Sequence, residues 1–424
     1  MEGADRERKE AGFKERTPVD EARRILSEAA VGGESDEPST GTETVPLERA
    51  DGRVLAAPIT AARNVPHYRR AAMDGYAVRA TDTFGASDRS PEVLRIGDRD
   101  GAVGPDRAVR VHTGSALPDG ADAVVMIEHV EELEDVGELE VDDAVAEGEN
   151  VAPIGEDVAE GTQLYDAGHR LRPSDIGLLR SVGYDRLEVA QRPTVGVVPT
   201  GEELVDTDPG PGEVIETNGL TVSRMVERWG ADATYRDVVT DDAESLRVAI
   251  QRDLTKDVVV TTGGSSVGER DLLPEVIDDL GEVLVHGVGL KPGHPVCLGI
   301  VEETPVLALP GYPVACIVNA VQFLRPTLRW LEGTAPDPHP TTPAVLERKI
   351  PSEPGTRTFA RVRLEEREDA AADEPAFAAT PTRASGSGVL SSVALADGWV
   401  VVDDDREGIA EGETVAVQDW ESHP

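Results

Sequence analysis

The sequence predicts a multidomain α/β protein, with one α/β domain built on a parallel-rich sheet and smaller β domains before and after it. At 424 residues the chain is too long for a single hydrophobic core, so about three domains are expected. From Arg192 onward, strand patterns alternate with helix patterns, which is typical of βαβ units. On either side, short runs rich in β-branched residues are broken by Gly and Pro, which favours strands.

The first expected element is a helix from Thr17 to about Ala30. Thr17 can cap its start, Pro18 suits its first turn, and Asp20 is favourable near the positive end of a helix. A polar loop is expected to follow at 32–41.

The segment from Arg53 to Leu187 is expected to form small mixed β domains. It contains GYAVRA, EVLRIG, AVRVHTG and ADAVVMI between turn residues. The run from Glu131 to Glu149 carries ten acids. It predicts a solvated loop or hairpin face rather than a metal site, because nothing forces its carboxylates to converge.

The α/β segment contains three pairs of alternating elements. Strands are expected at Thr194–Val198, Thr234–Val239 and Val258–Thr261. Helices are expected at Gly219–Trp229, Asp241–Arg252 and Glu269–Leu280. Residues 241–244 resemble a capping box for the second helix. Together these elements predict a parallel sheet covered by helices on both faces.

The last part of the chain contains a further strand, a buried helix and a second β domain. A strand is expected at Glu282–His286, and apolar residues between Val314 and Leu324 recur at helical spacing. The α/β domain should end near Gly333, because Thr334 to Pro343 contains four prolines and predicts a linker. The remainder, through Val417, predicts a small β-barrel or sandwich.

The charge of the chain is strongly acidic. It has 82 acids against 41 bases, a net charge of −41, and only five of the bases are lysines. These are Lys9, Lys14, Lys256, Lys291 and Lys349. A surface of this kind is expected in a halophilic protein, where salt screens the self-repulsion. The same charge argues against nucleic acid as a partner, because phosphates require Lys and Arg.

Cysteine content and hydropathy point to the cytoplasm. Cys297 and Cys316 are too far apart for a CxxC zinc or redox motif, which favours a reduced cytosolic protein. The first sixteen residues are charged throughout and lack the apolar core of a signal peptide. No run approaches the length of a membrane span, so no membrane partner is expected.

Two glycine-rich turns predict an anion-binding site. The first spans residues 261–271 after an expected strand, and its candidate ligand-binding residues are Gly263, Gly264, Ser265, Ser266 and Gly268. The second, at 309–313, again joins a strand to a helix and contains Pro310, Gly311 and Pro313. Glycines let backbone N–H groups approach a phosphate, and the following helix presents its positive end. Either turn alone is also explained as a tight turn.

Lys291 strengthens this hypothesis. It lies in a Pro/Gly loop, KPGHP, in a chain that has nearly abandoned lysine. A solvent-facing charge is the alternative, but the scarcity of lysine favours a phosphate partner. Asp74 in AAMDGYAV and Asp157 in PIGEDV also differ from the surface acids, because they sit in apolar, turn-containing stretches. Each alone is more often a turn-forming Asp.

The motifs together resemble one known family. AAMDGYAVRA, VHTGSALPDGADAVVMIE, PIGEDV, VVPTGEEL, TTGGSSVGERD, KPGHP and LPGYPV occur in this order, and the match extends from Asp20 to Val417. The chain resembles the molybdopterin molybdenumtransferases, enzymes related to the C-terminal half of gephyrin. The resemblance implies a homodimer of four-part chains. The parts are a helical connector (17–59 with 155–190), an inserted β domain (60–154), a molybdopterin-binding α/β domain (192–333) and a C-terminal β domain (341–420).

The resemblance also implies a reaction and the residues that perform it. Adenylyl-molybdopterin and molybdate react, with a divalent cation such as Mg²⁺, to give AMP and molybdenum cofactor; the upstream adenylyltransferase is an expected partner. The implied catalytic residues are Asp74, Asp157, Glu203, Asp241, Asp271 and Lys291. Thr113, the two glycine-rich turns and Ser387 are expected to bind substrate. Glu203 and Asp271 are candidate Mg²⁺ ligands, since carboxylates suit this hard cation.

The chain departs from the family pattern at two basic positions. Many relatives have KPGKP where this chain has His294, and some carry a lysine shortly before KPG, where this chain has Gly287. Positive charge in the site is therefore either lower, supplied by histidine, or offset by potassium; a permitted substitution is the simplest interpretation. Two other functions share parts of the fold: a gephyrin-like scaffold and a molybdopterin adenylyltransferase. The second would need only about residues 192–333. No residue selects molybdate over tungstate.

Overall fold

The computed structural model describes residues 16–32, 37–98, 101–263, 272–368, 370–371, 374–382 and 387–422. They fall into two compact units, and each is described by itself. The smaller unit comprises 44–51 and 57–188, and the larger unit comprises the rest. The expected α/β multidomain architecture is confirmed, and the limits of its four parts stay predictions. Within the described residues, no helix is long and apolar enough to cross a membrane.

The smaller unit is built around a six-stranded sheet in the order β7-β4-β6-β5-β9-β8. Its strands are β4 (Gly75–Val78), β5 (Glu92–Ile96), β6 (Arg107–Val111), β7 (Ala123–Met126), β8 (Val130–Leu133) and β9 (Glu138–Val141). Alternate residues of β4 enter different cores: Tyr76 and Val78 pack in one cluster, and Ala77 in another. The acidic run from Glu131 to Glu149 is expected from the sequence to form a loop or a hairpin face. It contains most of the β8–β9 hairpin, which is the second of these two forms.

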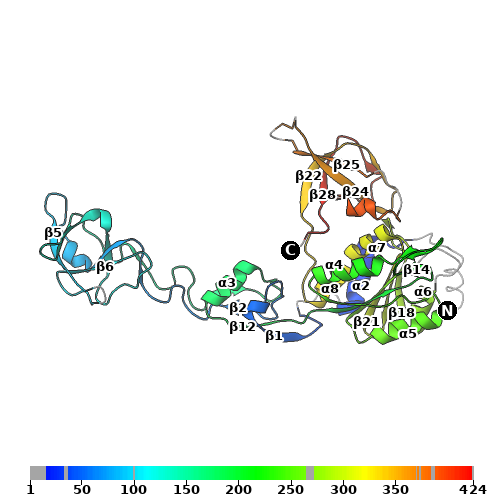
Figure 1. The fold of residues 1–424 in the computed structure, drawn as a ribbon, viewed down its shortest axis with the longest axis horizontal. Helices are drawn as coiled ribbons and strands as arrows, with labels where there is room; N and C mark the ends of the chain where they lie inside the picture. The colour runs from blue at the N-terminus through cyan, green and yellow to red at the C-terminus, as the bar shows by residue number, and fades with distance from the viewer. Residues whose placement is uncertain are drawn as a thin grey trace. The chain divides into compact units, whose positions relative to one another are not determined.

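Short elements complete this unit (Figure 1). Two-stranded pairs form from β2 (Ile59–Thr60) with β11 (Gln163–Tyr165), and from β3 (Arg70–Ala71) with β10 (Val151–Ala152). Helical turns are η1 (Leu47–Arg49), η2 (Ala80–Thr83), η3 (Ile127–His129) and α3 (Pro173–Ser181). β1 (Thr42–Pro46) pairs with β12 (Arg186–Ala190), and the first residues of β1 and the last residues of β12 belong to the larger unit. Pro173 suits the first turn of α3, where its missing N–H has no partner to lose.

The larger unit contains a second six-stranded sheet, in the order β16-β13-β17-β21-β20-β18. Its strands are β13 (Thr194–Pro199), β16 (Asp232–Tyr235), β17 (Val258–Thr262), β18 (Glu282–His286), β20 (Cys297–Val301) and β21 (Thr304–Leu309). The first four in spatial order are parallel, and β20 runs antiparallel to both of its neighbours, β21 and β18. The sheet is therefore parallel-rich but mixed. The strand expected at Thr234–Val239 begins two residues earlier and ends four residues earlier, because its pairing with β13 runs from Asp232 with Thr194 to Tyr235 with Val197.

Helices cover both faces of this sheet, as predicted. One face carries α2 (Val19–Val31), α4 (Asn218–Arg228) and α7 (Pro313–Asn319); the other carries α5 (Ala243–Asp253) and α6 (Leu273–Leu280). Strand β17 shows the alternation, since Val258 and Val260 pack with the first group and Val259 with the second. The final helix continues from α7 through the π-helical turn η4 (Ala320–Leu324) into α8 (Arg325–Leu331).

Two predicted helix starts differ in detail. Thr17 does not cap α2: the capping position is the extended Pro18, and no side chain caps the helix there. The residue before a proline favours extended backbone, and Thr17 pairs instead with Val288. Helix α5 begins after Asp242, whose carboxylate accepts from the Ser245 N–H at 2.9 Å. The expected start of the third helix at Glu269 lies outside the described residues.

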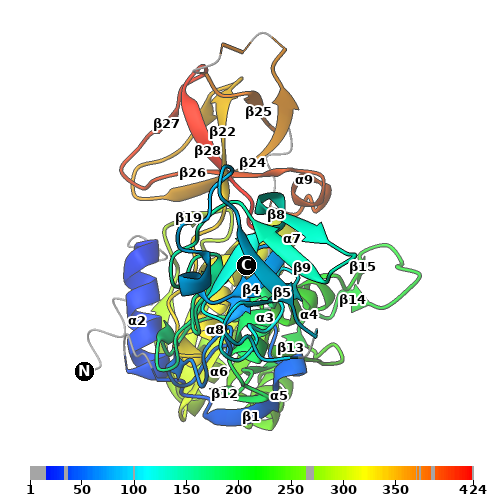
Figure 2. The same cartoon turned by 90° about the vertical axis from the view of Figure 1, so that its left-hand side faces the viewer.

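The C-terminal region of the larger unit is a closed five-stranded barrel, the first of the two forms predicted (Figure 2). The ring runs β24-β25-β22-β28-β26 and closes by pairing β26 with β24. Its elements are β22 (Thr341–Leu346), β23 (Ile350–Pro351), β24 (Arg357–Glu366), β25 (Phe377–Pro381), α9 (Ser391–Ala394), β26 (Gly398–Val402), β27 (Gly408–Ile409) and β28 (Thr414–Gln418). Strand β19 (Leu290–Lys291) pairs with β24, which ties the KPGHP loop to the barrel.

Candidate active site

Three loops meet at the carboxyl edge of the sheet in the larger unit. Strands β13, β17 and β21 end in register there, since Pro199 pairs with Thr262 and Thr262 with Leu309. The N–H of Gly263 donates to the Leu309 carbonyl at 3.1 Å. This is the edge at which open α/β sheets bind ligands.

Gly263 allows the loops to approach each other closely. Its φ is +147°, and a Cβ at this position would lie 2.1 Å from the carbonyl oxygen of Thr200. A Cβ on Gly311 would lie 3.4 Å from the Cα of Gly263. The structure therefore brings the beginnings of both predicted glycine-rich turns together. Gly264, Ser265, Ser266, Gly268 and Asp271 lie outside the described residues.

Three buried threonines lie at the ends of β13 and β17. Thr200, Thr261 and Thr262 are each 1% exposed, and among the described residues their Oγ1 atoms have no hydrogen-bond partner. A buried hydroxyl without a partner costs free energy, which a hydrogen bond to a water or to a bound ligand would recover. Sequence reasoning missed these residues, although the Thr-Thr pair immediately before Gly263 was an available signal.

Glu203 and Asp241 lie on segments that flank the end of β13. The N–H of Gly201 donates to the Val239 carbonyl at 3.1 Å. The residues just before Glu203 therefore lie beside the residues just before Asp241. A Cβ on Gly201 would lie 2.7 Å from a carboxylate oxygen of Glu203. Directly after Glu203, β14 (Leu204–Val205) pairs with β15 (Val214–Ile215).

The loop that carries Lys291 is fixed against α7. Lys291 itself is the end of β19, its side chain is 57% exposed, and its Nζ lies 3.7 Å from Glu353. Asn319 donates to the Gly293 carbonyl at 3.0 Å. Burial, with a smaller effect of Arg16, lowers the pKa of His294. His294 is therefore a poor substitute for the second lysine of the family motif.

The start of α7 is held by contacts from both sides. The side-chain amide of Asn218 donates to the Gly311 carbonyl at 2.7 Å. The N–H of Val314 donates to the carbonyl of Ser387 at 3.0 Å. Pro310 and Pro313 flank this turn, so the structure brings Ser387 to the second glycine-rich turn.

Asp74 and Thr113 form a pair in the smaller unit. Asp74 Oδ1 accepts from the Thr113 N–H at 2.6 Å and from its hydroxyl at 2.9 Å. These two bonds, the backbone one first, lower the pKa of Asp74. Gly75 is required beside them, because a Cβ there would lie 1.9 Å from the Val125 carbonyl. Asp157 lies on a separate turn, where its N–H donates to the Val65 carbonyl at 3.0 Å.

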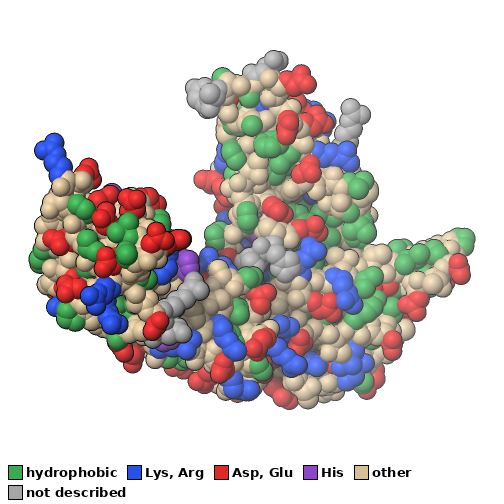
Figure 3. Space-filling model, turned by 60° about the vertical axis from the view of Figure 1, so that its left-hand side comes forward, with side chains coloured by type: hydrophobic (Ala, Val, Ile, Leu, Met, Phe, Trp, Pro, Cys, Tyr) green, Lys and Arg blue, Asp and Glu red, His purple; other side chains and the backbone are tan. Residues whose placement is uncertain are grey.

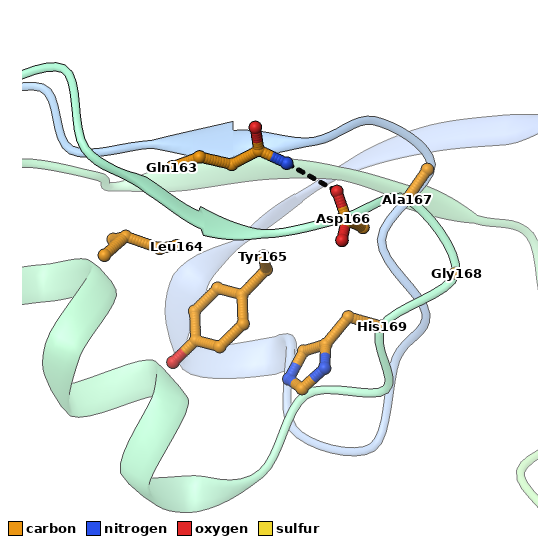
Figure 4. A pocket seen from close by; sticks show the side chains of 7 residues that line it. All are labelled: Gln163, Leu164, Tyr165, Asp166, Ala167, Gly168 and His169. Carbon is orange, nitrogen blue, oxygen red and sulfur yellow. Dashed lines mark hydrogen bonds between the residues drawn. The ribbon is translucent and has the colours of Figure 1, made fainter.

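The smaller unit also has a pocket of about 570 Å³ that sequence reasoning did not predict (Figure 4). Tyr165 and His169 line it with stacked rings, 4.4 Å between centroids. The buried Asp175 beneath accepts from Tyr165 at 3.1 Å and contacts His169 at 2.8 Å. Burial would raise the pKa of Asp175, but bonds from Arg172, His169 and Tyr165 together hold it well below its usual range.

Metal ligands are few in the described part of the chain. It contains no group of three His, Cys, Asp or Glu side chains placed to hold an ion. Mg²⁺, however, is usually held by one or two carboxylates together with substrate phosphates. The oxygen donors at the sheet edge, Glu203, Asp241 and the threonine hydroxyls, are of the kind that this cation prefers.

Three family models match the chain in succession. Residues 17–183 match the MoeA N-terminal region (domain I and II), 196–330 a probable molybdopterin binding domain, and 343–420 the MoeA C-terminal region (domain IV). A molybdopterin biosynthesis protein of Methanocaldococcus jannaschii is 36% identical over 385 residues, 88% of this chain and 91% of that one. A molybdopterin molybdenumtransferase of Bacillus subtilis is 33% identical over 94% of this chain and 93% of its own length. A MoeA crystal structure from Pyrococcus horikoshii matches 96% of this chain and 100% of that one, with TM-score 0.81 and 33% identity.

Proposed function

The chain belongs to the MoeA family of molybdopterin molybdenumtransferases, transferases that insert molybdenum into molybdopterin, and we propose that it uses adenylyl-molybdopterin and molybdate and releases AMP. One observation supports this most directly. Gly263 lies against Thr200 and Gly311 at the carboxyl edge of the sheet, among buried threonine hydroxyls that lack partners in the described residues. Such an edge suits a phosphorylated ligand.

The proposed phosphate site combines backbone donors with one lysine. The turns at Gly263 and Gly311 would cradle the diphosphate, together with the remaining residues of the first turn. Lys291 would supply the positive charge, since its only described ion pair is a long one, with Glu353. Ser387, Pro310 and Pro313 would shape the wall of the site beside the start of α7.

Mg²⁺ would be held by carboxylates at the same edge. We propose Glu203 and Asp241 for this role, with Asp271 as predicted from the motif. When bound, the cation supplies charge neutralisation on the phosphate from which AMP departs. Asp74 would act as an ionised carboxylate, because the Thr113 hydrogen bonds favour its charged form. Asp157 is proposed from its motif alone.

The alternative functions explain less of the chain. A molybdopterin adenylyltransferase would need about residues 192–333, whereas matches to MoeA regions extend through 17–183 and 343–420. A gephyrin-like scaffold would not release AMP. Both alternatives remain outcomes of the assay described below.

The cellular setting is proposed from the charge and the family. We propose a homodimer in a salt-rich cytoplasm that receives its substrate from the upstream adenylyltransferase. Acidic side chains are scattered over the face shown in Figure 3, as expected of a halophilic surface. No nucleic acid or membrane partner is proposed. Either molybdate or tungstate could serve as the oxyanion, since both have the same charge and a similar size.

The test is AMP release by the purified protein with adenylyl-molybdopterin and Mg²⁺. Release that requires molybdate and is lost in Asp74→Asn supports the transferase. No release, with the protein folded in molar KCl, would favour the scaffold or the adenylyltransferase. The same assay with tungstate in competition measures oxyanion preference.

A further inference from the structure

An exposed aromatic ring lies on the loop that joins β21 to α7. Tyr312 is 62% exposed, in a chain with an aromatic content of only 4%. It directly follows Gly311, the glycine whose position lies against Gly263. The ring therefore stands at the carboxyl edge of the sheet, beside the proposed phosphate site.

The backbone of Tyr312 is fixed before any ligand binds. Its φ and ψ are −79° and 128°, the extended conformation that Pro313 favours in the preceding residue. Its carbonyl accepts from the Cys316 N–H at 2.8 Å, and Asn218 holds the carbonyl of Gly311 at 2.7 Å. Little ordering of the main chain is needed for the ring to bind, which favours affinity.

Glycine borders the ring. A Cβ on Gly388 would lie 3.3 Å from Cδ1 of Tyr312 and 3.7 Å from Cε1. The segment that carries Gly388 is tied down where the Ser387 carbonyl accepts from the Val314 N–H at 3.0 Å. The wall beside the ring is thus backbone. Neither Gly311 nor Gly388 has a side chain that would block the approach of a flat ligand.

We propose that Tyr312 is a stacking subsite for a flat heteroaromatic ring carried on a phosphate, either the pterin or the adenine of the substrate. This inference rests on the proposed function. A phosphate at Gly263 leaves the attached ring system within reach of the neighbouring loop. Stacking uses the face of the ring rather than its hydroxyl, so other aromatic residues should serve.

The experiment compares Tyr312→Ala, Tyr312→Phe and Tyr312→Trp with the unmodified protein. Dissociation constants for adenylyl-molybdopterin and for AMP are measured by calorimetry in molar KCl. Tyr312→Ala should weaken adenylyl-molybdopterin binding at least fivefold, at the lower end of the roughly 1–3 kcal/mol that a stacked base contributes. Tyr312→Phe and Tyr312→Trp should bind as the unmodified protein does. Phe84→Ala is the matched control, because Phe84 is 61% exposed in the smaller unit.

Each outcome decides a separate question. A parallel loss of AMP affinity in Tyr312→Ala identifies the stacked ring as adenine, and AMP affinity that is measurable and unchanged in this variant identifies it as the pterin. Unchanged adenylyl-molybdopterin affinity in Tyr312→Ala overturns the subsite and leaves the proposed function standing. An unmodified protein that binds neither compound overturns the proposed function, and the subsite with it.

Discussion

Thr113 donates twice to one oxygen of Asp74, through its N–H at 2.6 Å and its hydroxyl at 2.9 Å. The two residues are 39 positions apart, and the pairing of β4 with β6 brings them together, since Gly75 pairs with Val111. The backbone bond is the larger cause of the lowered pKa of Asp74, and the hydroxyl bond is the next. The pair can therefore be weakened in part without removing the carboxylate.

Thr113→Val should shift the acidic limb of the pH profile to higher pH. The variant loses the hydroxyl donor and keeps the backbone donor, so the pKa of Asp74 rises but stays below its usual value. The measurement is kcat/KM for AMP release against pH. Thr113→Ser keeps a hydroxyl and should keep the original profile. An acidic limb that is the same in all three proteins would mean that ionisation of Asp74 does not limit the reaction.

Lys291→Ala should weaken substrate binding and leave the fold intact. The side chain is 57% exposed, so little packing is lost. A charge-assisted contact to phosphate is expected to contribute about 1.5–3 kcal/mol, which corresponds to roughly 10- to 150-fold in Kd. Calorimetry with adenylyl-molybdopterin measures it, and Lys349→Ala, on the exposed surface of the barrel, is the control. An unchanged Kd would remove Lys291 from the site.

Thr262→Val should separate binding from stability. The substitution removes a buried hydroxyl that has no partner in the described residues, so the free energy of unfolding should stay level or rise by about 1 kcal/mol. Affinity for adenylyl-molybdopterin should fall. Thr304→Val provides the contrast, because its hydroxyl donates to the Leu254 carbonyl at 3.3 Å and its loss should destabilise the fold without affecting binding. Urea unfolding and calorimetry measure both quantities; full affinity in Thr262→Val would exclude its hydroxyl from ligand binding.

Asp175→Asn should destabilise the smaller unit at neutral pH. Because the folded-state pKa of Asp175 is lowered, its stabilising contribution is complete above the unfolded value of about 3.9 and is lost as pH falls through the folded value. We expect a loss of about 1.5–3 kcal/mol at pH 7 that shrinks below roughly pH 4. Asp166→Asn, at an exposed position in the same pocket, should have a smaller effect.

Hydrogen exchange of peptides from residues 163–188 is the suitable measurement for this variant. All four tryptophans, at 229, 330, 399 and 420, lie in the larger unit, so their fluorescence does not report on Asp175. Equal protection in Asp175→Asn and the unmodified protein at neutral pH would show that the Tyr165–His169–Asp175 cluster contributes nothing to stability.

The protein should require salt to stay folded and to form the proposed homodimer. With 82 acids and a net charge of −41, self-repulsion is screened only when the Debye length falls from ~8 Å at physiological ionic strength to ~3 Å at 1 M. Thermal unfolding and solution mass are measured between these concentrations of KCl. A melting temperature and mass that do not change with salt would refute the halophilic assignment.

The sequence by itself determined the alternation of strands and helices after Arg192 and the exact extent of β18, Glu282–His286. These features depend on local pattern: β-branched runs, helical spacing and turn residues each act within a few positions. Glycine-rich turns after β17 and β21 were visible for the same reason, since the residues that allow a tight turn lie in the turn itself.

Only the tertiary structure decided which of those residues meet. The contact of Gly263 with Thr200 depends on the register of β13 against β17, and the Asp74–Thr113 pair depends on β4 against β6. The reversed direction of β20 between β21 and β18 and the closure of the barrel by β26 on β24 likewise depend on which strands pair. Pairing joins residues far apart in the chain, and its free energy comes from packing that no local run of sequence contains.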